Sequence, residues 1–135
     1  MPDIESVLFT RLTGFAGLTA LINKRVYPLV MPQAEGLEKK LPCIVYQKIT
    51  GRHIYSHGGE SNLTRSRYQF SCYAKTHVSA WNVTRQLQAA LSAWSDMTVT
   101  PAVFVCFLEM EMDLYDSTIE TFRVIADYAI WHEES

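Results

Sequence analysis

The sequence of 135 residues lacks the marks of several protein classes. It has only three cysteines, Cys43, Cys72 and Cys106, with no Cys-x-x-Cys spacing among them. An odd number of cysteines inside strand-like apolar runs favours buried free thiols, which indicates a reducing compartment such as a cytoplasm. Charged residues make up 19% of the chain and hydrophobic residues 48%, which excludes a disordered chain. We expect one globular domain over residues 1–135.

Strong net charge and long apolar runs are also missing. The formal net charge is −2, so the sequence does not predict the basic surface patch that nucleic-acid-binding proteins use. No apolar run approaches the ~20 residues that span a bilayer. The first residues, Met-Pro-Asp-Ile-Glu-Ser, lack the basic and apolar regions of a signal peptide. We therefore expect no membrane partner.

Motifs for catalysis and metal binding are absent or weak. The chain has no Gly-x-Ser-x-Gly, P-loop or dinucleotide-binding turn. His53, His57 and Glu60 have a spacing that zinc sites use, but they lie in a Gly-rich segment without a second ligand cluster. Cys72 is predicted on an apolar strand face, where burial makes a thiol inert. The sequence predicts no enzyme, no cofactor and no metal site.

Hydrophobic periodicity divides the chain into helices and strands. Helical spacing runs from Ile4 to about Thr13 behind a candidate cap at Asp3, and again from residue 80 to residue 94 behind Thr76 or Ser79. The other predicted segments are a short helical turn at 18–23, an extended piece at 25–28, a long loop at 29–42, strands at 43–50 and 63–74, and a loop or hairpin tip at 51–62. In the strand at 63–74, Tyr68, Phe70 and Cys72 are predicted to face one way and Arg65 and Arg67 the other.

The last third of the chain is the clearest pattern. Residues 102–132 alternate with a period of two, which predicts two long strands joined by a tight turn. Simple alternation places Leu108, Met110 and Met112 on the core face with residues 124, 126, 128 and 130, and it places Glu109, Glu111 and Asp113 together on the other face. Same-face positions lie ~6.5–7 Å apart along a strand, too far for three carboxylates to share one metal ion. They are predicted to form a solvated or partner-facing acidic stripe.

These elements predict an α+β fold. The expected architecture is a mainly antiparallel four-stranded sheet plus a short strand, with two helices packed on one face. Trp81 lies about 130° from the apolar face of its helix, which predicts either contact with a partner or packing under a loop. Met31, Leu37, His53, Ile54 and Tyr55 lie in loop contexts and are candidate interface residues.

A series of short segments resembles one known family in order and spacing. The segments are Arg25-Val-Tyr-Pro, Leu41-Pro-Cys-Ile-Val-Tyr-Gln, Tyr68-Gln-Phe-Ser-Cys-Tyr-Ala, Asp113-Leu-Tyr-Asp and Phe122-Arg-Val-Ile-Ala-Asp-Tyr-Ala-Ile-Trp-His. Together they resemble the tail-completion, or tail-terminator, proteins of long-tailed bacteriophages and prophages. The resemblance covers nearly the whole chain.

The resemblance implies a structural role in virion assembly. Such a protein forms a ring, usually a hexamer, that caps the tail tube, ends its polymerisation and presents the head-joining surface. The implied partners are further copies of the chain, the tail tube protein and the head-tail connector or stopper, with DNA passing through the ring without specific binding. The implied location is the virion tail, assembled in the cytoplasm of the bacterial host. Alternatives are a head-completion neck protein or, in a different class, a small ligand-binding domain or enzyme.

Overall fold

The structure is a computed structural model that describes residues 4–28, 41–56, 59–99, 101–117 and 121–133. The described part contains the helices α1 (Ile4–Gly14), α2 (Ala16–Ile22) and α3 (His77–Leu91). It also contains the strands β1 (Val26–Pro28), β2 (Cys43–Ser56), β3 (Gly59–Ala74), β4 (Val103–Asp116) and β5 (Thr121–Glu133). No described helix is long and apolar enough to cross a membrane.

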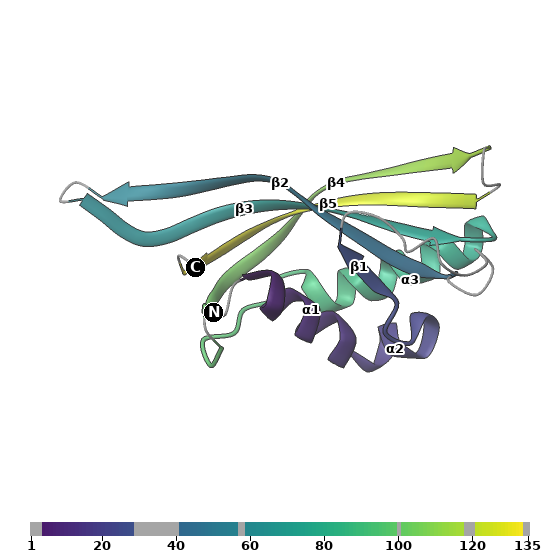
Figure 1. Ribbon diagram of the computed structural model, residues 1–135, viewed down its shortest axis with the longest axis horizontal. Coiled ribbons are helices and arrows are strands. Elements are labelled where there is room, and N and C mark those ends of the chain that lie inside the picture. The colour runs from purple at the N-terminus through teal and green to yellow at the C-terminus, as the bar shows by residue number, and fades with distance from the viewer. Residues whose placement is uncertain (1–3, 29–40, 57–58, 100, 118–120, 134–135) are drawn as a thin grey trace.

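The strands form one mixed sheet with the order β1-β2-β3-β5-β4. The short strand β1 is parallel to β2, and the other neighbours are antiparallel. All three helices lie on one face of this sheet (Figure 1), so the fold has two layers. The predicted α+β class and the mainly antiparallel sheet are confirmed, and the helical turn expected at 18–23 is the separate helix α2.

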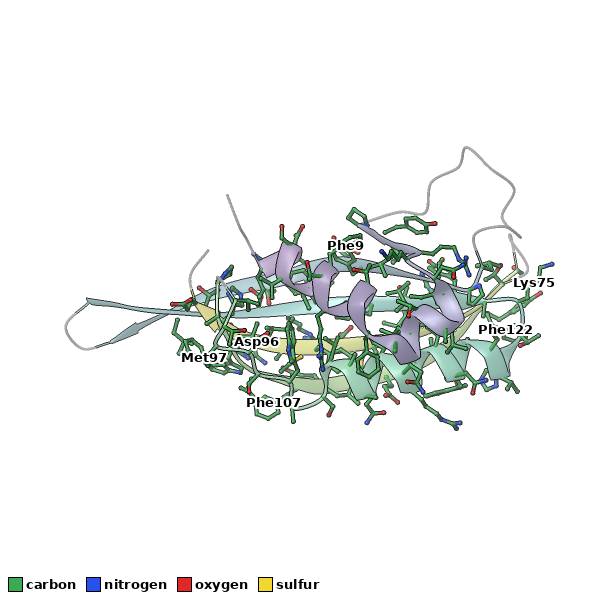
Figure 2. The ribbon with its side chains drawn as sticks, turned by 90° about the horizontal axis from the view of Figure 1, so that it is seen from below. Phe9, Lys75, Asp96, Met97, Phe107 and Phe122 are labelled. Atoms are coloured by element: carbon green, nitrogen blue, oxygen red, sulfur yellow. The ribbon has the colours of Figure 1, made fainter. Side chains whose placement is uncertain are left out.

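The core lies between the helices and the sheet. On the sheet side, Tyr68, Phe70 and Cys72 are completely buried, as their alternation in β3 predicted. On the helix side, Thr76 is the one of the two predicted caps that starts α3, because its side chain accepts a hydrogen bond from the backbone N–H of Ser79 at 3.1 Å. Figure 2 is seen from the helix side and shows the helices in front of the strands.

In the described part of the core, one buried hydroxyl has no hydrogen-bond partner. The ring of Tyr128 packs edge-on against Phe70 with centroids 5.7 Å apart, and no described donor or acceptor reaches its hydroxyl. Burial raises the pKa of the Tyr128 phenol, so the neutral O–H persists. A buried hydroxyl without a hydrogen bond costs about 1–3 kcal/mol.

The Tyr128→Phe substitution is therefore expected to raise the free energy of unfolding by about 1 kcal/mol. Urea denaturation followed by fluorescence measures it. A loss of stability would show that the hydroxyl has a partner in solution.

The β2–β3 hairpin extends beyond the helices at one end of the molecule (Figure 1). The two strands stay paired from Cys43 opposite Tyr73 out to Ser56 opposite Gly59, with irregularities after Lys48 and Ile54. The sequence predicted either a loop or the tip of a hairpin at residues 51–62, and the structure shows the hairpin. We call residues 47–66 the arm.

Simple alternation is wrong for β4. The strand has register shifts between Val103 and Val105 and between Leu108 and Met110. Each shift inserts an extra residue, which reverses the faces of the residues that follow. Met110 and Met112 therefore pair with Asp127 and Ile125 on the face away from the helices, and Met112 is exposed rather than part of the core.

Candidate assembly surfaces

The acidic residues of β4 do not form one stripe. Glu111 lies opposite Ala126 and Asp113 opposite Val124, and both of these β5 residues belong to the core face. Glu109 falls within the irregularity and forms an ion pair with Arg65. Arg65 lies opposite Trp131, which puts this pair on the face away from the helices. The prediction that Glu109 shares a face with Glu111 and Asp113 is therefore wrong, because the bulge at Glu109 changes the phase of the strand.

Two arginines of β3 form ion pairs on the face of the sheet that the helices leave uncovered. Arg65 bonds to Glu109 and also lies over the ring of Trp131, with its guanidinium carbon 5.9 Å from the centroid. Arg67 donates a hydrogen bond of 2.6 Å to Oδ2 of Asp127, whose side chain is 4% exposed.

A cluster of aromatic side chains lies where the N-terminus of α3 meets β4 and β5. The indole N–H of Trp81 donates to Nε2 of His77 at 2.9 Å, and His77 also packs on Phe122 with centroids 6.0 Å apart. Asp113 lies 3.4 Å from His77, and Tyr115 packs on Phe122 at 4.9 Å. Trp81 is half-buried in this cluster, so part of its surface is used within the chain.

Apolar side chains are exposed along β4. Phe107 is 53% exposed, Met112 45% and Tyr115 54%. Near the start of the strand, Phe104 and Val105 line an apolar hollow of about 420 Å³ with residues from the neighbouring strands, Leu63 and Trp131. Figure 2 shows Phe107 at the margin of the molecule. So many exposed apolar residues on one edge strand are typical of a surface that another protein covers.

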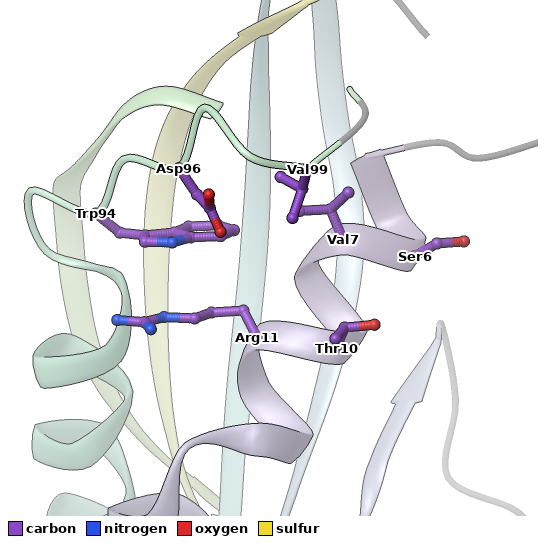
Figure 3. A pocket seen from close by; sticks show the side chains of 7 residues that line it. All are labelled: Ser6, Val7, Thr10, Arg11, Trp94, Asp96 and Val99. Atoms are coloured by element: carbon purple, nitrogen blue, oxygen red, sulfur yellow. The ribbon is translucent and has the colours of Figure 1, made fainter. Parts of the chain in front are cut away.

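A second hollow lies between α1 and the segment after α3 (Figure 3). Arg11 lies between the rings of Phe15 and Trp94, 5.3 and 5.5 Å from their centroids, and its Nε donates to the carbonyl of Ala90. Asp96 accepts hydrogen bonds from Thr98, and these bonds lower the pKa of its carboxyl. The charged groups of this hollow are thus engaged in holding α1 and the α3–β4 connection in place.

The three cysteines are free thiols and completely buried. Burial raises the pKa of Cys72 and of Cys106 to about 12. Among the described residues, no group of three His, Cys, Asp or Glu side chains is arranged to hold a metal ion. The Cys72 thiol lies inside the core, as its position in β3 predicted.

Native protein is therefore expected to resist thiol reagents at pH 8, because at a pKa of about 12 only about one thiol in 10⁴ is a thiolate. The raised pKa values also mean that the Cys72 and Cys106 thiols contribute stability below the unfolded pKa of about 9, and that this contribution is lost as the pH rises towards 12. Labelling with a coloured disulfide reagent in buffer and in urea tests the expectation. Rapid labelling of the native protein would contradict it.

The structure describes only some of the other predicted interface residues. His53, Ile54 and Tyr55 lie in the outer part of β2, within the arm, so they share one projecting element. Met31 and Leu37 lie outside the described residues. Phe107 and Phe122 were not predicted as interface residues, although an aromatic residue on an otherwise acidic strand is a usable signal for Phe107.

Comparison with known proteins gives a family and a shared fold. Residues 6–133 match the model of the family described as "Tail completion protein gp17". A chain in the solved structure titled "Virion of native gene transfer agent (GTA) particle" has the same fold, with a TM-score of 0.77, 12% sequence identity, and coverage of 94% of this chain and 92% of that one. A search of curated proteins gave no match. Since the family model spans nearly the whole chain, this protein belongs to the phage tail completion proteins and is a structural component of the virion.

Proposed function

We propose that the protein caps the phage tail tube, ends its polymerisation and forms the surface to which the head is joined. The observation that carries this proposal is the family match over residues 6–133. The fold shared with a chain of a virion particle supports it, because nearly the whole of both chains superimposes. A sheet that carries exposed apolar residues on an edge strand, together with a projecting hairpin, suits a protein that works within an assembly.

The working form that we propose is a closed ring, a hexamer as in the family resemblance. A ring of identical chains needs two different surfaces on each copy that meet head to tail. The arm and β4 lie at opposite sides of the sheet order, so each copy offers two such surfaces. The proposed partners are further copies of the chain, the tail tube protein and the head-tail connector.

DNA is proposed to pass through this ring without specific binding. The net charge of −2 supports this, as does the pairing of Arg65 and Arg67 with carboxylates of the same chain. Because Glu109 lies on the opposite face from Glu111 and Asp113, the three carboxylates do not form one wall. We assign them no joint role in lining a lumen.

Deletion of the gene in its phage or prophage tests the proposal. Loss of a terminator is expected to give overlong or unjoined tails, which electron microscopy of lysates detects. A complementing plasmid with the wild-type gene is the control and is expected to restore tail length. Tails of normal length together with heads that have lost their DNA would contradict the proposal and would identify a neck stopper instead.

A further inference from the structure

We propose that neighbouring copies of this chain join edge to edge, the free edge of β2 in one copy pairing with the free edge of β4 in the next. The inference rests on the proposed ring and specifies its contact. The partner at each edge is thus a second copy of this chain. The supporting observations are the positions, lengths, charges and exposed apolar residues of the two edges.

Both edges are open over matching lengths. On β2, the short strand β1 covers only Ile44–Tyr46, and in the described part of the chain no strand pairs with the outer side of Gln47–Ser56. On β4, backbone bonds from Asp96 and Ala93 reach Val103 and Cys106, and no described strand pairs with the outer side of Phe107–Asp116. Each open segment has ten residues, about 33 Å of extended chain, so the two can pair along their full length.

The two edges carry opposite charge. The open segment of β2 contains the bases Lys48 and Arg52 and no acid. The open segment of β4 contains Glu109, Glu111, Asp113 and Asp116 and no base. Glu109 pairs with Arg65 and Asp113 lies 3.4 Å from His77 within the same chain, and the acids of this segment still outnumber its bases by four to none. Opposite charges on facing strands stabilise the pairing, and like charges oppose it.

This charge distribution selects the type of contact. Pairing of β4 with β4, or of β2 with β2, would bring like charges together and is disfavoured. Pairing of β2 with β4 uses a different surface on each partner, and such head-to-tail contacts generate rings or filaments rather than two-fold dimers. The charges therefore favour the geometry that a ring requires.

Pairing also covers apolar surface that the isolated chain leaves in water. Phe107, Met112 and Tyr115 are each about half exposed along the open segment of β4. Ile49, at the irregularity of β2, is 42% exposed. A long edge strand with exposed apolar residues is a template for pairing with another chain. The acidic side chains between these residues restrict that pairing to a basic partner edge.

A charge-swap experiment tests this contact. The β2 variant is Lys48→Glu/Arg52→Glu, and the β4 variant is Glu111→Lys/Asp113→Lys. Each alone removes the opposite charge of the two edges at every junction, so its self-association constant is expected to fall at least tenfold. In an equimolar mixture, the unchanged β2 of the β4 variant can pair with the unchanged β4 of the β2 variant. At the next junction, the two substituted edges meet, with glutamates on β2 and lysines on β4. Alternating assemblies of the two variants are therefore expected to form again. Native mass spectrometry and negative-stain microscopy measure the size and shape of the oligomers, with and without tail tubes from the same genome.

The matched control is Lys24→Glu/Arg85→Glu, which makes the same charge change as the β2 variant at two exposed positions outside both open segments and is expected to assemble like the wild type. Circular dichroism checks that every variant is folded, and an unfolded variant is replaced by Lys48→Gln/Arg52→Gln or Glu111→Gln/Asp113→Gln, each expected to weaken association. Oligomers from either charge-reversal variant alone, no rescue on mixing, or wild-type protein that binds tubes without self-association would overturn edge pairing while leaving the proposed function standing. Wild-type protein that neither self-associates nor binds tubes would contradict the proposed function itself.

Discussion

Replacing Phe70 by alanine is expected to lower the free energy of unfolding by about 4 kcal/mol. The ring of Phe70 is completely buried at the centre of the sheet's core face. It touches an aromatic group formed by Tyr46, Tyr68 and Tyr128, with ring centroids 6.4, 6.4 and 5.7 Å from its own. Alanine would leave a cavity that these rings cannot close, and typical domains have only about 5–15 kcal/mol of stability in total. Urea denaturation measures the change.

Phe107→Ala is the matched control for Phe70→Ala. Phe107 is 53% exposed on β4, so its removal is expected to cost less than about 1 kcal/mol in the isolated chain. The same residue change thus separates a core position from a candidate interface position. A loss below about 1.5 kcal/mol for Phe70→Ala would contradict the packing of the helices on this face of the sheet.

Replacing Arg67 by methionine is expected to cost about 2–3 kcal/mol. Arg67 holds Oδ2 of Asp127 at 2.6 Å, and no other described group bonds to the buried Oδ1 of that carboxylate. Without the arginine, the carboxylate would remain buried between strands with no partner for its charge. The cost lies at the low end for a buried pair because the Arg67 side chain is 36% exposed.

The double variant Arg67→Met/Asp127→Leu tests the cause of this loss. Removing both charges is expected to restore most of the stability, since apolar residues commonly replace a buried ion pair without loss. The control is Arg65→Met, which breaks the more exposed pair with Glu109 and is expected to cost less than about 1 kcal/mol. A double variant as unstable as Arg67→Met would show that the loss comes from packing of the arginine rather than from the unpaired carboxylate.

The parts of the fold that follow strict periodicity could be predicted from the sequence. In β3 the alternation identified Tyr68, Phe70 and Cys72 as core residues, because the strand keeps an unbroken register with β5 from Leu63 to Ala74. Helix α3 was predicted with its cap at Thr76 or Ser79, because a hydroxyl residue before an apolar helical pattern is typical of a helix start, and the structure selects Thr76. The family resemblance, which the family model confirms, depended on the order of such segments.

The faces of β4 could not be predicted, because a β-bulge leaves no reliable mark on the local sequence. Phe104 and Glu109 are the residues at the two irregularities, and neither is a glycine or proline. The true faces follow from the partner strand: Asp113 lies opposite Val124, and Met110 opposite Asp127. Likewise, the ion pair of Arg67 with Asp127 joins residues 60 positions apart, and the sequence contains no information on which of several arginines makes it.

The most direct measurement of the tail-end role is cryo-electron microscopy of intact particles from the same genome. The expected result is a ring of this fold at the head-proximal end of the tail tube, with the arm of each copy beside β4 of the next. The same fold found at the tail tip, along the tube or only in the head would contradict the assignment as tail terminator.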